Sequence, residues 1–496
     1  MIYPSLKEVK KIITNEEYKV VPLSMELYSD IKTPIETLKI LKGISTNVFI
    51  LESVDSTHKI GRYTFLGYDP KLELTCYNRK LKITTGTTIE EEVKHPNKYI
   101  RKILKENKSP RIAGMPTFTG GLVGYFSYDY IKYGEQSLNL DSNDEEKFND
   151  VDLMLFDKVI AFDNYRQKII LIVNIKVENL EVNYRKAEVE LKTMANLIIN
   201  GKAAEESALN IKSDFKSYFS KEQYCNMVVK AKEYIKEGEI FQVVLSNRIE
   251  AEIEGSILDS YRVLRSTNPS PYMFYFYSND IEISGASPET LVKLENNKLY
   301  TFPLAGTRKR GKNDAEDIEF EKDLLNDEKE LAEHNMLVDL GRNDIGKISE
   351  INSVKVDKYM VIEKFSHVMH IGSTVSGTLR GDKDSLDAID SILPAGTLSG
   401  APKLRACEII NELEGNKRGI YGGAIGYIDF TGNLDMCISI RLAFAKNGKV
   451  FVRSGAGIVA DSVPENEYDE CINKSKAVID ALNIAGGGLD NDTFNR

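Results

Sequence analysis

Three apolar segments near the carboxyl end constrain the fold more than any other part of the chain. They are YGGAIGYIDF, LDMCISIRLAFA and KVFVRSGAGIV, and the short polar links TGN and KNGK join them. Asn447-Gly448, in the second link, is the residue pair preferred in two-residue hairpin turns, whose central residues need a positive φ. Strands joined by such turns run antiparallel. We therefore predict an antiparallel meander over residues 421–459, in which LDMCISIRLAFA is one strand.

Strand-like patterns also fill most of residues 18–200, and an amphipathic helix near residues 183–199 ends this stretch. The residues that follow are polar and weakly patterned, which predicts a linker. The predicted division is an N-terminal region over residues 1–200, a linker over 201–217, a second domain over 218–482 and a flexible tail over 483–496.

Composition excludes several classes of function. The chain has 65 Lys and Arg against 75 Asp and Glu, and its net charge of −10 argues against a broad surface for nucleic acid or for an anionic membrane. The five cysteines show no CxxC or CxxH spacing, so neither a zinc site nor a disulfide framework is predicted. No run approaches the roughly 20 apolar residues of a membrane span, and the N-terminus lacks the apolar segment of a signal peptide. We expect a cytoplasmic protein that is not bound to a membrane.

Two acidic pairs stand out because each would lie on one face of a helix. Glu330 and Glu333 are three residues apart, and so are Glu467 and Glu470. Two helices that each turn two carboxylates toward a shared cleft could hold Mg²⁺, which prefers oxygen ligands. The alternative is two solvated helix faces, which is the more common explanation for one such pair alone. A capping box that starts at Ser462 predicts where the second helix begins.

Arg441 is the most informative single residue of the predicted meander. On a strand, small neighbours would share its face and leave room beside the guanidinium group. An arginine in that position suits a carboxylate clamp, although an internal salt bridge explains it equally well. Gly455 and Gly457, on the next strand, would let backbone N–H groups approach an anion closely, or they mark a β-bulge.

Three further polar residues lie within apolar patterns. Gln242, Glu289 and His370 are each explained more simply by a structural role when they are considered alone. The sequence contains no P-loop, GxSxG or HExxH motif, which disfavours nucleotide-driven and serine-nucleophile chemistry. Together with the acidic pairs and Arg441, these observations indicate a metal-dependent enzyme that acts on a small polyanion.

A more specific signal comes from seven segments in order along the chain: GEIFQVVLSNR (238–248), GASPET (285–290), PLAGTRKRG (303–311), ELAEHNMLVDLGRND (330–344), PAGTLSGAPK (394–403), GIYGGAIGY (419–427) and RSGAGIVADSVPENEYDECINKS (453–475). They resemble the chorismate-utilising enzymes, and the resemblance covers nearly the whole chain. It implies an α/β (α+β) fold, with a large antiparallel β-sheet sandwich flanked by helices and the active site in a cleft.

The resemblance also implies roles for individual residues. It makes four acids the ligands of a Mg²⁺ ion that bridges to the ring carboxylate of chorismate: Glu330, Glu333, Glu467 and Glu470. Glu289 becomes the general acid that protonates the departing C4 hydroxyl group, and His370 contacts the substrate and assists the later loss of pyruvate. The residues implied to bind substrate are Thr307, Thr397, Tyr421, Arg441, Gly455, Gly457 and Lys474.

Two positions separate the branches of this family. Relatives that use water carry a lysine base at the position of Gln242, and relatives that form aminodeoxychorismate generally carry a lysine at the position of Ala305. An uncharged amide cannot activate water but suffices for ammonia, which is already nucleophilic. The resemblance therefore implies that ammonia attacks C2 of chorismate and that pyruvate is then eliminated, which gives anthranilate. The alternatives are an aminodeoxychorismate-forming enzyme without that lysine and a non-catalytic amino-acid sensor on the same fold.

The source of ammonia implies a partner. A glutaminase domain with its Cys-His-Glu triad does not fit within 496 residues in addition to these motifs. We therefore expect a separate glutamine amidotransferase subunit.

The N-terminal region offers no obvious chemistry but is large enough for a second ligand site. In the resembling enzymes L-tryptophan inhibits from a site between an LLES-like segment and an NPSPYMF segment. The corresponding residues here are Glu52, Ser53, Pro271, Tyr272 and Met273. Plain packing of a strand end against a proline turn is the alternative. The chain contains no tryptophan (Trp 0), so it can be synthesised when tryptophan is scarce, which is a weak hint that tryptophan regulates it.

Overall fold

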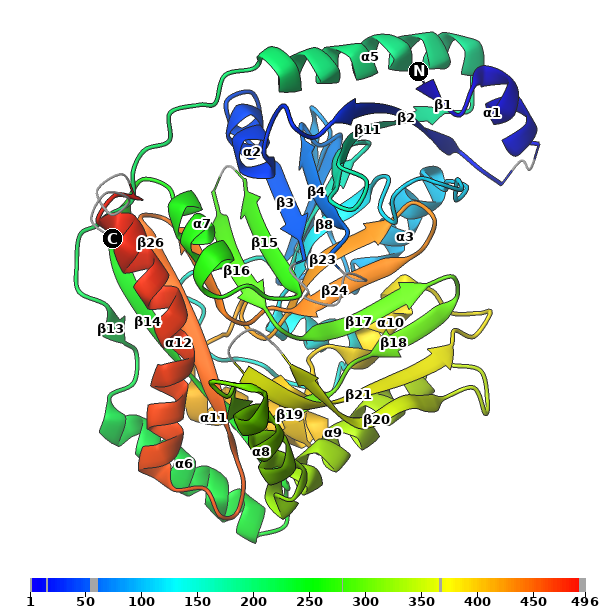
Figure 1. The fold of residues 1–496 in the computed structure, drawn as a ribbon. Helices are drawn as coiled ribbons and strands as arrows, with labels where there is room; N and C mark the ends of the chain where they lie inside the picture. The colour runs from blue at the N-terminus through cyan, green and yellow to red at the C-terminus, as the bar shows by residue number, and fades with distance from the viewer. Residues whose placement is uncertain (1, 15–16, 54–60, 279, 365–367, 490–496) are drawn as a thin grey trace.

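The structure is a computed structural model that describes residues 2–14, 17–53, 61–278, 280–364 and 368–489. Two large antiparallel sheets form its centre, and helices cover them from outside (Figure 1). This architecture confirms the predicted fold class. None of the helices in the described ranges combines the length and the apolar character that crossing a bilayer requires.

The larger sheet has 14 strands within the described residues. Its order, from one edge to the other, is β1 (Ile2–Tyr3), β2 (Val20–Tyr28), β11 (Lys168–Lys176), β10 (Lys158–Asp163), β4 (Tyr63–Tyr68), β3 (Val48–Glu52), β15 (Tyr272–Tyr277), β16 (Glu282–Ser287), β25 (Leu442–Lys446), β26 (Lys449–Ile458), β14 (Gln242–Glu254) and β12 (Asn210–Ile211), with β13 (Lys216–Ser217) and β22 (Gly400–Ala401) also paired to β14.

The second sheet has 12 strands within the same residues. Its order is β19 (Leu304–Lys309), β21 (Val368–Thr378), β18 (Lys298–Thr301), β17 (Thr290–Glu295), β24 (Leu434–Ile438), β23 (Ala424–Asp429), β8 (Gly121–Phe126), β9 (Val151–Phe156), β5 (Leu72–Tyr77), β6 (Lys80–Thr84) and β7 (Thr88–Glu92), with β20 (Lys355–Lys364) paired to β21.

Helices cover the outer faces and the ends of the sheets. They are α1 (Leu6–Ile12), α2 (Pro34–Lys42), α3 (Asn97–Glu106), α4 (Ile131–Gly134), α5 (Leu180–Asn200), α6 (Lys221–Lys236), α7 (Leu258–Thr267), α8 (Asp314–Leu325), α9 (Glu328–Gly346), α10 (Ser385–Ile392), α11 (Lys403–Glu414) and α12 (Pro464–Gly486), with the 3₁₀ turns η1 (Tyr128–Tyr130) and η2 (Gly396–Leu398). In Figure 1, α12 runs along β26, whereas α8 and α9 lie beside β19 and β21.

Two apolar cores explain why so many strands are apolar on both faces. One core contains side chains from both sheets, such as Phe49 and Leu122, and fills the space between them. A second core lies on the other face of the larger sheet, where Val48 and Ile50 of β3 pack beneath α2. Side chains alternate along a strand, so a strand between two cores has no polar face.

The predicted meander is correct in its turns but wrong in one strand. Asn447 and Gly448 have φ of +52° and +73° and close the hairpin between β25 and β26, as their sequence predicts. LDMCISIRLAFA, however, is not one strand, because it leaves the second sheet after Ile438 and enters the larger sheet at Leu442. Arg441 lies in this crossover, with φ of +53°, and not in the middle of a strand.

The segment DLMLFDKVIAF makes the same crossing. Its first half is β9 of the second sheet and its second half is β10 of the larger sheet, with Asp157 between them. An apolar run shows no break where a chain leaves one buried sheet and enters another, because both sides of the crossing are equally apolar. Periodicity alone therefore does not reveal either crossing.

The ends of two further predictions need adjustment. Helix α12 begins at Pro464 with Val463 as its N-cap and no side-chain cap, so the predicted capping box is wrong; Ser462 Oγ instead accepts a hydrogen bond from Val459 N at 3.1 Å. The helix continues to Gly486, which is within the predicted tail, and residues 490–496 lie outside the described residues.

The predicted domain boundary stays a prediction. Both sheets contain strands from before residue 201 and after residue 217, and the short strands β12 and β13 lie within the predicted linker.

Candidate functional site

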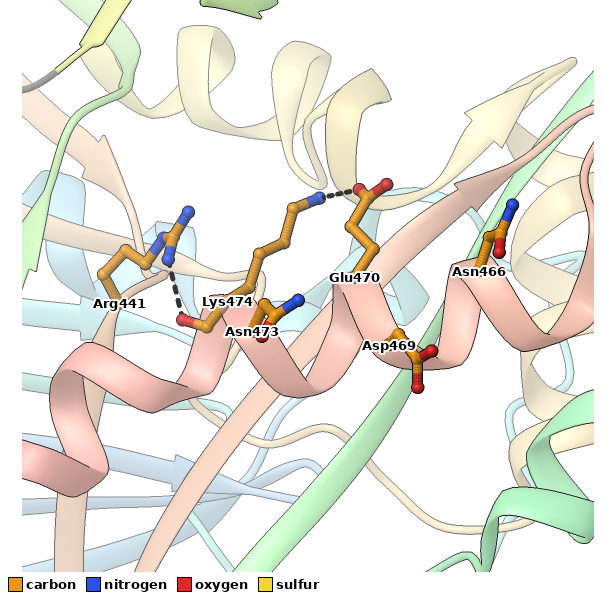
Figure 2. A pocket seen from close by; sticks show the side chains of 6 residues that line it. All are labelled: Arg441, Asn466, Asp469, Glu470, Asn473 and Lys474. Atoms are coloured by element: carbon orange, nitrogen blue, oxygen red, sulfur yellow. Dashed lines mark hydrogen bonds and ion pairs between the residues drawn. The ribbon is translucent and has the colours of Figure 1, made fainter. Parts of the chain in front are cut away.

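An open cleft lies between the crossover at Arg441 and one side of α12. Its volume is about 450 Å³, and it is lined by Arg441, Asn466, Asp469, Glu470, Asn473 and Lys474. Figure 2 shows the side chains of Arg441, Lys474 and Glu470 on the same side of α12. Lys474 Nζ lies 2.6 Å from Glu470 Oε1 and donates a hydrogen bond to the Gly455 carbonyl oxygen at 3.1 Å. The cleft therefore combines two cations and two acids, and it brings Arg441 of the crossover beside charged side chains of α12.

Arg441 is held by its backbone and by one hydrogen bond. Its Nη1 donates to the carbonyl oxygen of Lys474 at 2.7 Å, and its own carbonyl accepts from Ala286 N at 3.0 Å. It forms no ion pair among the described residues, which disfavours the internal salt bridge. Burial lowers the pKa of Arg441, but a guanidinium group stays charged in proteins. The side chain is thus a buried cation with donors left for an anion.

Glu289 is a partly buried carboxyl group close to this cation. It lies between β16 and β17, and Ile438 N donates a hydrogen bond to its carbonyl oxygen at 3.0 Å. Burial raises the pKa of the Glu289 carboxyl, whereas a hydrogen bond from Thr397 Oγ1 to Oε2, at 3.2 Å, and the positive charges of Lys474 and Arg441 oppose this effect. A carboxyl that holds its proton more tightly than usual suits a general acid.

His370, on β21, has a defined tautomer. Its Nδ1 lies 2.7 Å from the Gly306 carbonyl oxygen, which can only accept, so Nδ1 carries the proton and Nε2 is the basic nitrogen. Thr307 Oγ1 lies 3.1 Å from the same Nδ1. Burial lowers the pKa of the imidazole, which keeps it neutral. The hydrogen bonds fix the plane of the ring.

The four predicted metal-binding acids lie on α9 and α12. Burial raises the pKa of Glu330, Glu333 and Glu467. Repulsion by neighbouring carboxylates raises two of these pKa values further: Glu330 and Glu470 act on Glu333, and Glu470 acts on Glu467. The two helices therefore turn like charges toward one another. Two of the acids are paired with cations: Glu330 lies 3.6 Å from Arg308, and Glu470 is paired with Lys474.

This donor set suits Mg²⁺ in its chemistry, since it consists of carboxylate oxygens, which are hard ligands, in a partly buried site. Among the described residues, however, no three metal-ligating side chains converge on one point. Two of the four acids are engaged by cations instead. Binding of the ion would require α9 and α12 to bring their carboxylates closer together.

Gln242 opens β14 next to β26. The residue is 5% exposed, and its Oε1 has no hydrogen-bond partner among the described residues. A Cβ at Gly457 would lie 2.6 Å from Gln242 Nε2, and one at Gly455 would lie 2.6 Å from the Leu245 carbonyl oxygen. The pairing of β14 with β26 has no register shift, so the two glycines do not mark a bulge. They allow the strands and the amide to pack closely.

Tyr421 lies in the loop that precedes β23. Its ring is buried, burial raises the pKa of its hydroxyl, and the Arg418 guanidinium lies 5.9 Å from the ring centre. The structure thus brings Glu289 together with Thr397 through a hydrogen bond and places it near the positive charges of Arg441 and Lys474, and it brings Thr307 into contact with His370.

A second, more enclosed cavity of about 410 Å³ lies between the sheets. All five residues predicted for the inhibitor site line it, namely Glu52, Ser53, Pro271, Tyr272 and Met273. Ser53 Oγ is buried without a hydrogen-bond partner among the described residues. Glu52, in contrast, is already paired with the Arg265 guanidinium and accepts a hydrogen bond from the Tyr261 hydroxyl.

Two polar residues of this cavity were missed at the level of sequence. Asp435, on β24, accepts a hydrogen bond from the Tyr272 hydroxyl at 2.8 Å, and burial raises the pKa of its carboxyl. Lys293, on β17, also lines the cavity. A signal for Asp435 existed, because an acid inside the apolar segment LDMCISI needs a buried partner. Lys293 gave no such signal.

Comparison with known proteins gives one family and a consistent set of relatives. The family described as chorismate binding enzyme matches residues 46–480. Anthranilate synthase component 1 of Acetivibrio thermocellus is 47% identical over 98% of this chain and 99% of that protein. The same protein of Aquifex aeolicus is 42% identical over 97% of this chain and 98% of its own length.

Solved structures agree with these relatives. The crystal structure of anthranilate synthase component I from Streptococcus pneumoniae is 37% identical, has a TM-score of 0.74, and covers 91% of this chain and 98% of that one. The isochorismate synthase MenF of Escherichia coli is 18% identical with a TM-score of 0.70, over 96% of this chain and 98% of that one, and this likeness shows the fold alone.

Proposed function

Because the chain belongs to the chorismate-binding enzymes and, within them, to the anthranilate synthase component 1 family, we propose that it converts chorismate and ammonia into anthranilate and pyruvate. The observation that carries the proposal is the position of Glu289, a partly buried carboxyl with a raised pKa that is hydrogen-bonded to Thr397 and close to Arg441 and Lys474. An acid for a leaving hydroxyl and a cation for a carboxylate are what this displacement requires.

In the first step, nitrogen of ammonia forms a bond to C2 of chorismate, both ring double bonds shift, the C4 hydroxyl departs, and the new ammonium group releases one proton. Glu289 gives its proton to that hydroxyl, which leaves as water. Arg441, with guanidinium donors left for an anion, would hold the enolpyruvyl carboxylate, with Tyr421 and the amides near Gly455 and Gly457 beside it. Binding at this group fixes the distance between C4 and the acid.

In the second step, the C3–O bond breaks, pyruvate departs, and loss of the C2 proton makes the ring aromatic. His370 supports this step, because its Nδ1 proton is committed to Gly306 and the neutral ring presents Nε2 as its basic nitrogen. The hydrogen bond that His370 Nδ1 donates to the Gly306 oxygen and the contact of Nδ1 with Thr307 Oγ1 orient the imidazole without an additional acid.

The nucleophile is ammonia and not water, since Gln242 cannot act as a base. Its amide oxygen is buried and lacks a hydrogen-bond partner among the described residues, so it is available to accept a hydrogen bond from an incoming ammonia molecule. Ala305, in β19, is buried and offers no nucleophile.

Mg²⁺ would be held by Glu330, Glu333, Glu467 and Glu470, and when bound it would neutralise these acids and the ring carboxylate of chorismate. A separate glutamine amidotransferase subunit would supply ammonia, in keeping with the designation component 1 of the relatives. L-Tryptophan would inhibit from the cavity lined by Glu52, Ser53 and Pro271 through Met273.

The test is identification of the product by mass spectrometry after incubation with chorismate, Mg²⁺ and an ammonium salt. We expect equal amounts of anthranilate and pyruvate from the wild type and little of either from Glu289→Gln. Formation of 4-amino-4-deoxychorismate without pyruvate would assign the chain to the other ammonia-using branch. A chain that leaves chorismate unchanged while it still binds an amino acid would be a sensor.

A further inference from the structure

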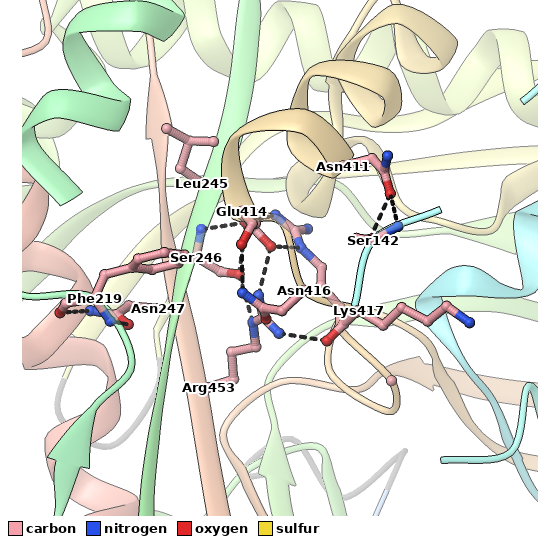
Figure 3. A network of polar contacts seen from close by, with 12 residues as sticks. Ser142, Phe219, Leu245, Ser246, Asn247, Asn411, Glu414, Asn416, Lys417 and Arg453 are labelled. Atoms are coloured by element: carbon pink, nitrogen blue, oxygen red, sulfur yellow. Dashed lines mark hydrogen bonds and ion pairs between the residues drawn. The ribbon is translucent and has the colours of Figure 1, made fainter. Parts of the chain in front are cut away.

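Three charged side chains lie completely inside the protein beneath the proposed site. The exposed fractions of the Glu414, Arg418 and Arg453 side chains are 0%, 1% and 1%. Figure 3 shows Glu414 and Arg453 in a network that also contains Ser246 of β14. Burial of three ions costs free energy unless hydrogen bonds satisfy each of them, so such a network indicates a specific role.

Glu414 is the centre of this network. Its Oε1 accepts hydrogen bonds from the backbone N and the Oγ of Ser246, at 2.7 and 2.9 Å, and its Oε2 accepts from Arg418 Nε at 3.0 Å and Arg453 Nη2 at 2.7 Å. Arg453 Nε also donates to Ser246 Oγ, at 2.8 Å. The positive charges of Arg418 and Arg453 hold the pKa of Glu414 below its usual value despite its burial.

Arg418 uses its remaining donors on two backbone carbonyls near proposed site residues. Its Nη1 donates to the Leu398 oxygen and its Nη2 to the Val244 oxygen, each at 2.6 Å. Leu398 follows Thr397 in the turn η2, and Val244 lies two residues after Gln242. One rigid guanidinium group therefore connects the segments that carry two proposed site residues.

Other contacts hold the Arg418 guanidinium group in place. The ring of Tyr128 stacks on the Arg418 guanidinium, at 4.5 Å from its centre, which fixes the plane of the group. Arg453 Nη1 donates to the Lys417 oxygen at 2.9 Å and so holds the chain that leads to Arg418. The Arg418 guanidinium therefore helps to orient η2, together with the hydrogen bond from Val244 N to the Ser399 oxygen at 2.9 Å and the pairing of β22, which follows η2, with β14.

We propose that Arg418 is a positioning residue, which holds η2 so that the Thr397 hydroxyl stays within hydrogen-bonding reach of Glu289. The inference rests on the proposed role of Glu289 as the acid. The other charges that face Glu289 are Arg441, in the crossover, and Lys474, on α12, and neither is bonded to Arg418. A change at Arg418 therefore reaches Glu289 through Thr397.

The test compares Arg418→Lys, Thr397→Val and the double variant in the full-length chain. The chorismate kcat is measured against pH with the concentration of free ammonia held constant. Lysine keeps the charge beside Glu414 but cannot bond Glu414 and both carbonyls in the same geometry. Loss of the Thr397 bond favours the protonated form of Glu289, so both single variants should move the alkaline limb of the profile to higher pH. Their kcat should fall about tenfold or more, because the acid is misplaced.

The double variant should show no larger shift than Thr397→Val, since both changes break the same bond. Arg248→Lys is the matched control, because Arg248 is 8% exposed on the same strand as Val244 but has no contact with η2. Its profile should match that of the wild type. Thermal unfolding of every variant separates misplacement from loss of folded protein.

Two outcomes would contradict the inference. If Thr397→Val moves the limb and Arg418→Lys only lowers kcat, Arg418 supports the fold and does not position η2. If Thr397→Val also leaves the limb in place, Glu289 is not the titrating acid and the proposed function is wrong at that residue. Should Arg418→Lys be insoluble, Ser246→Ala, which removes one hydroxyl from Glu414 and Arg453, must give a smaller upward shift. An unmoved limb in that variant would also refute the inference.

Discussion

At the scale of single residues, the environment of Glu289 decides what the site can do. The carboxyl is partly buried, which favours its protonated form, while Thr397, Arg441 and Lys474 keep it able to release the proton. These opposing effects produce an acid that is active when protonated. The rate should therefore fall as the pH rises through the raised pKa of Glu289.

Replacement of Glu289 by Gln should lower kcat by a factor on the order of 100 or more, because an amide has no proton of suitable acidity to give to the leaving hydroxyl. The amide oxygen can still accept the Thr397 hydrogen bond. A group with a raised pKa in the folded state contributes stability that is lost as the pH rises through that pKa. The variant should therefore be at least as stable as the wild type in alkaline solution.

Steady-state kinetics measures the expected loss of kcat, and thermal unfolding over a range of pH measures the expected stability of the Gln variant. Glu289→Asp is the matched control, since it keeps the acid but shortens it by one methylene group, and should retain more activity than Gln. A Gln variant with wild-type kcat would exclude Glu289 as the acid.

At the scale of elements, α9 and α12 present four acids that repel one another. Asp327 caps α9 by accepting hydrogen bonds from Lys329 N at 3.1 Å and Glu330 N at 3.3 Å, so the first turn of this helix fixes where Glu330 emerges. A substrate with two carboxylates adds further negative charge between the helices. A divalent cation is the simplest means to offset this repulsion.

We expect turnover to require Mg²⁺, and excess EDTA to abolish it until Mg²⁺ is restored. Glu330→Gln and Glu470→Gln should each remove most of the activity and raise the Mg²⁺ concentration that is needed for half-maximal rate. Asp339→Asn is the control, because Asp339 is an exposed residue of α9 whose partner within the described part of the chain is Arg342, at 3.0 Å. Full turnover in excess chelator would refute the metal site.

At the scale of the whole molecule, strands from both ends of the chain alternate in the sheets, and a hydrogen bond connects the inhibitor cavity with the segment that carries Glu289. Tyr272, which lines the inhibitor cavity, has its hydroxyl 2.9 Å from Thr290 Oγ1, and Thr290 directly follows Glu289. A ligand in that cavity would therefore contact Tyr272, whose hydroxyl is hydrogen-bonded to the segment that carries Glu289. Coupling of about 1–3 kcal/mol between the two sites would suffice for inhibition.

L-Tryptophan should accordingly inhibit the wild type, and Ser53→Phe should remove the inhibition, because the larger side chain fills the cavity. Ser53→Ala is the matched control: it removes the unpaired hydroxyl but keeps the volume, so it should remain inhibited. Calorimetric titration measures tryptophan binding, and inhibition curves in ammonium salts measure the loss of activity, for the wild type and both variants. Absence of tryptophan binding to the wild type, or full inhibition of Ser53→Phe, would show that the assignment of this cavity is wrong.

The purified chain should use ammonium salts and not glutamine, because its described fold is accounted for by the two sheets and their helices, and no motif of a glutaminase was found in the sequence. Addition of a glutamine amidotransferase subunit of the family should confer glutamine-dependent turnover. Formation of anthranilate from chorismate and glutamine by the pure chain would contradict this prediction.

Local patterns were enough to predict part of this structure. The Asn447-Gly448 hairpin followed from the need for positive φ at both positions, and the helices that carry the acidic pairs followed from the spacing of Glu330 and Glu333. The motifs also identified the family, since short segments around a site are fixed by its chemistry. These features depend on residues that are neighbours in the chain.

Tertiary structure alone decided the rest. The crossover at Arg441 was not visible, because the chain is equally apolar in both sheets that it connects. The contact of Thr397 with Glu289 joins residues 108 positions apart, and the network at Arg418 depends on carbonyl groups, which every residue has and no sequence pattern marks. Short-range patterns thus indicate the hairpin, the acidic helices and the chemistry of the family, whereas burial and long-range packing decide where strands cross between the sheets, which side chains meet and which proton each one holds.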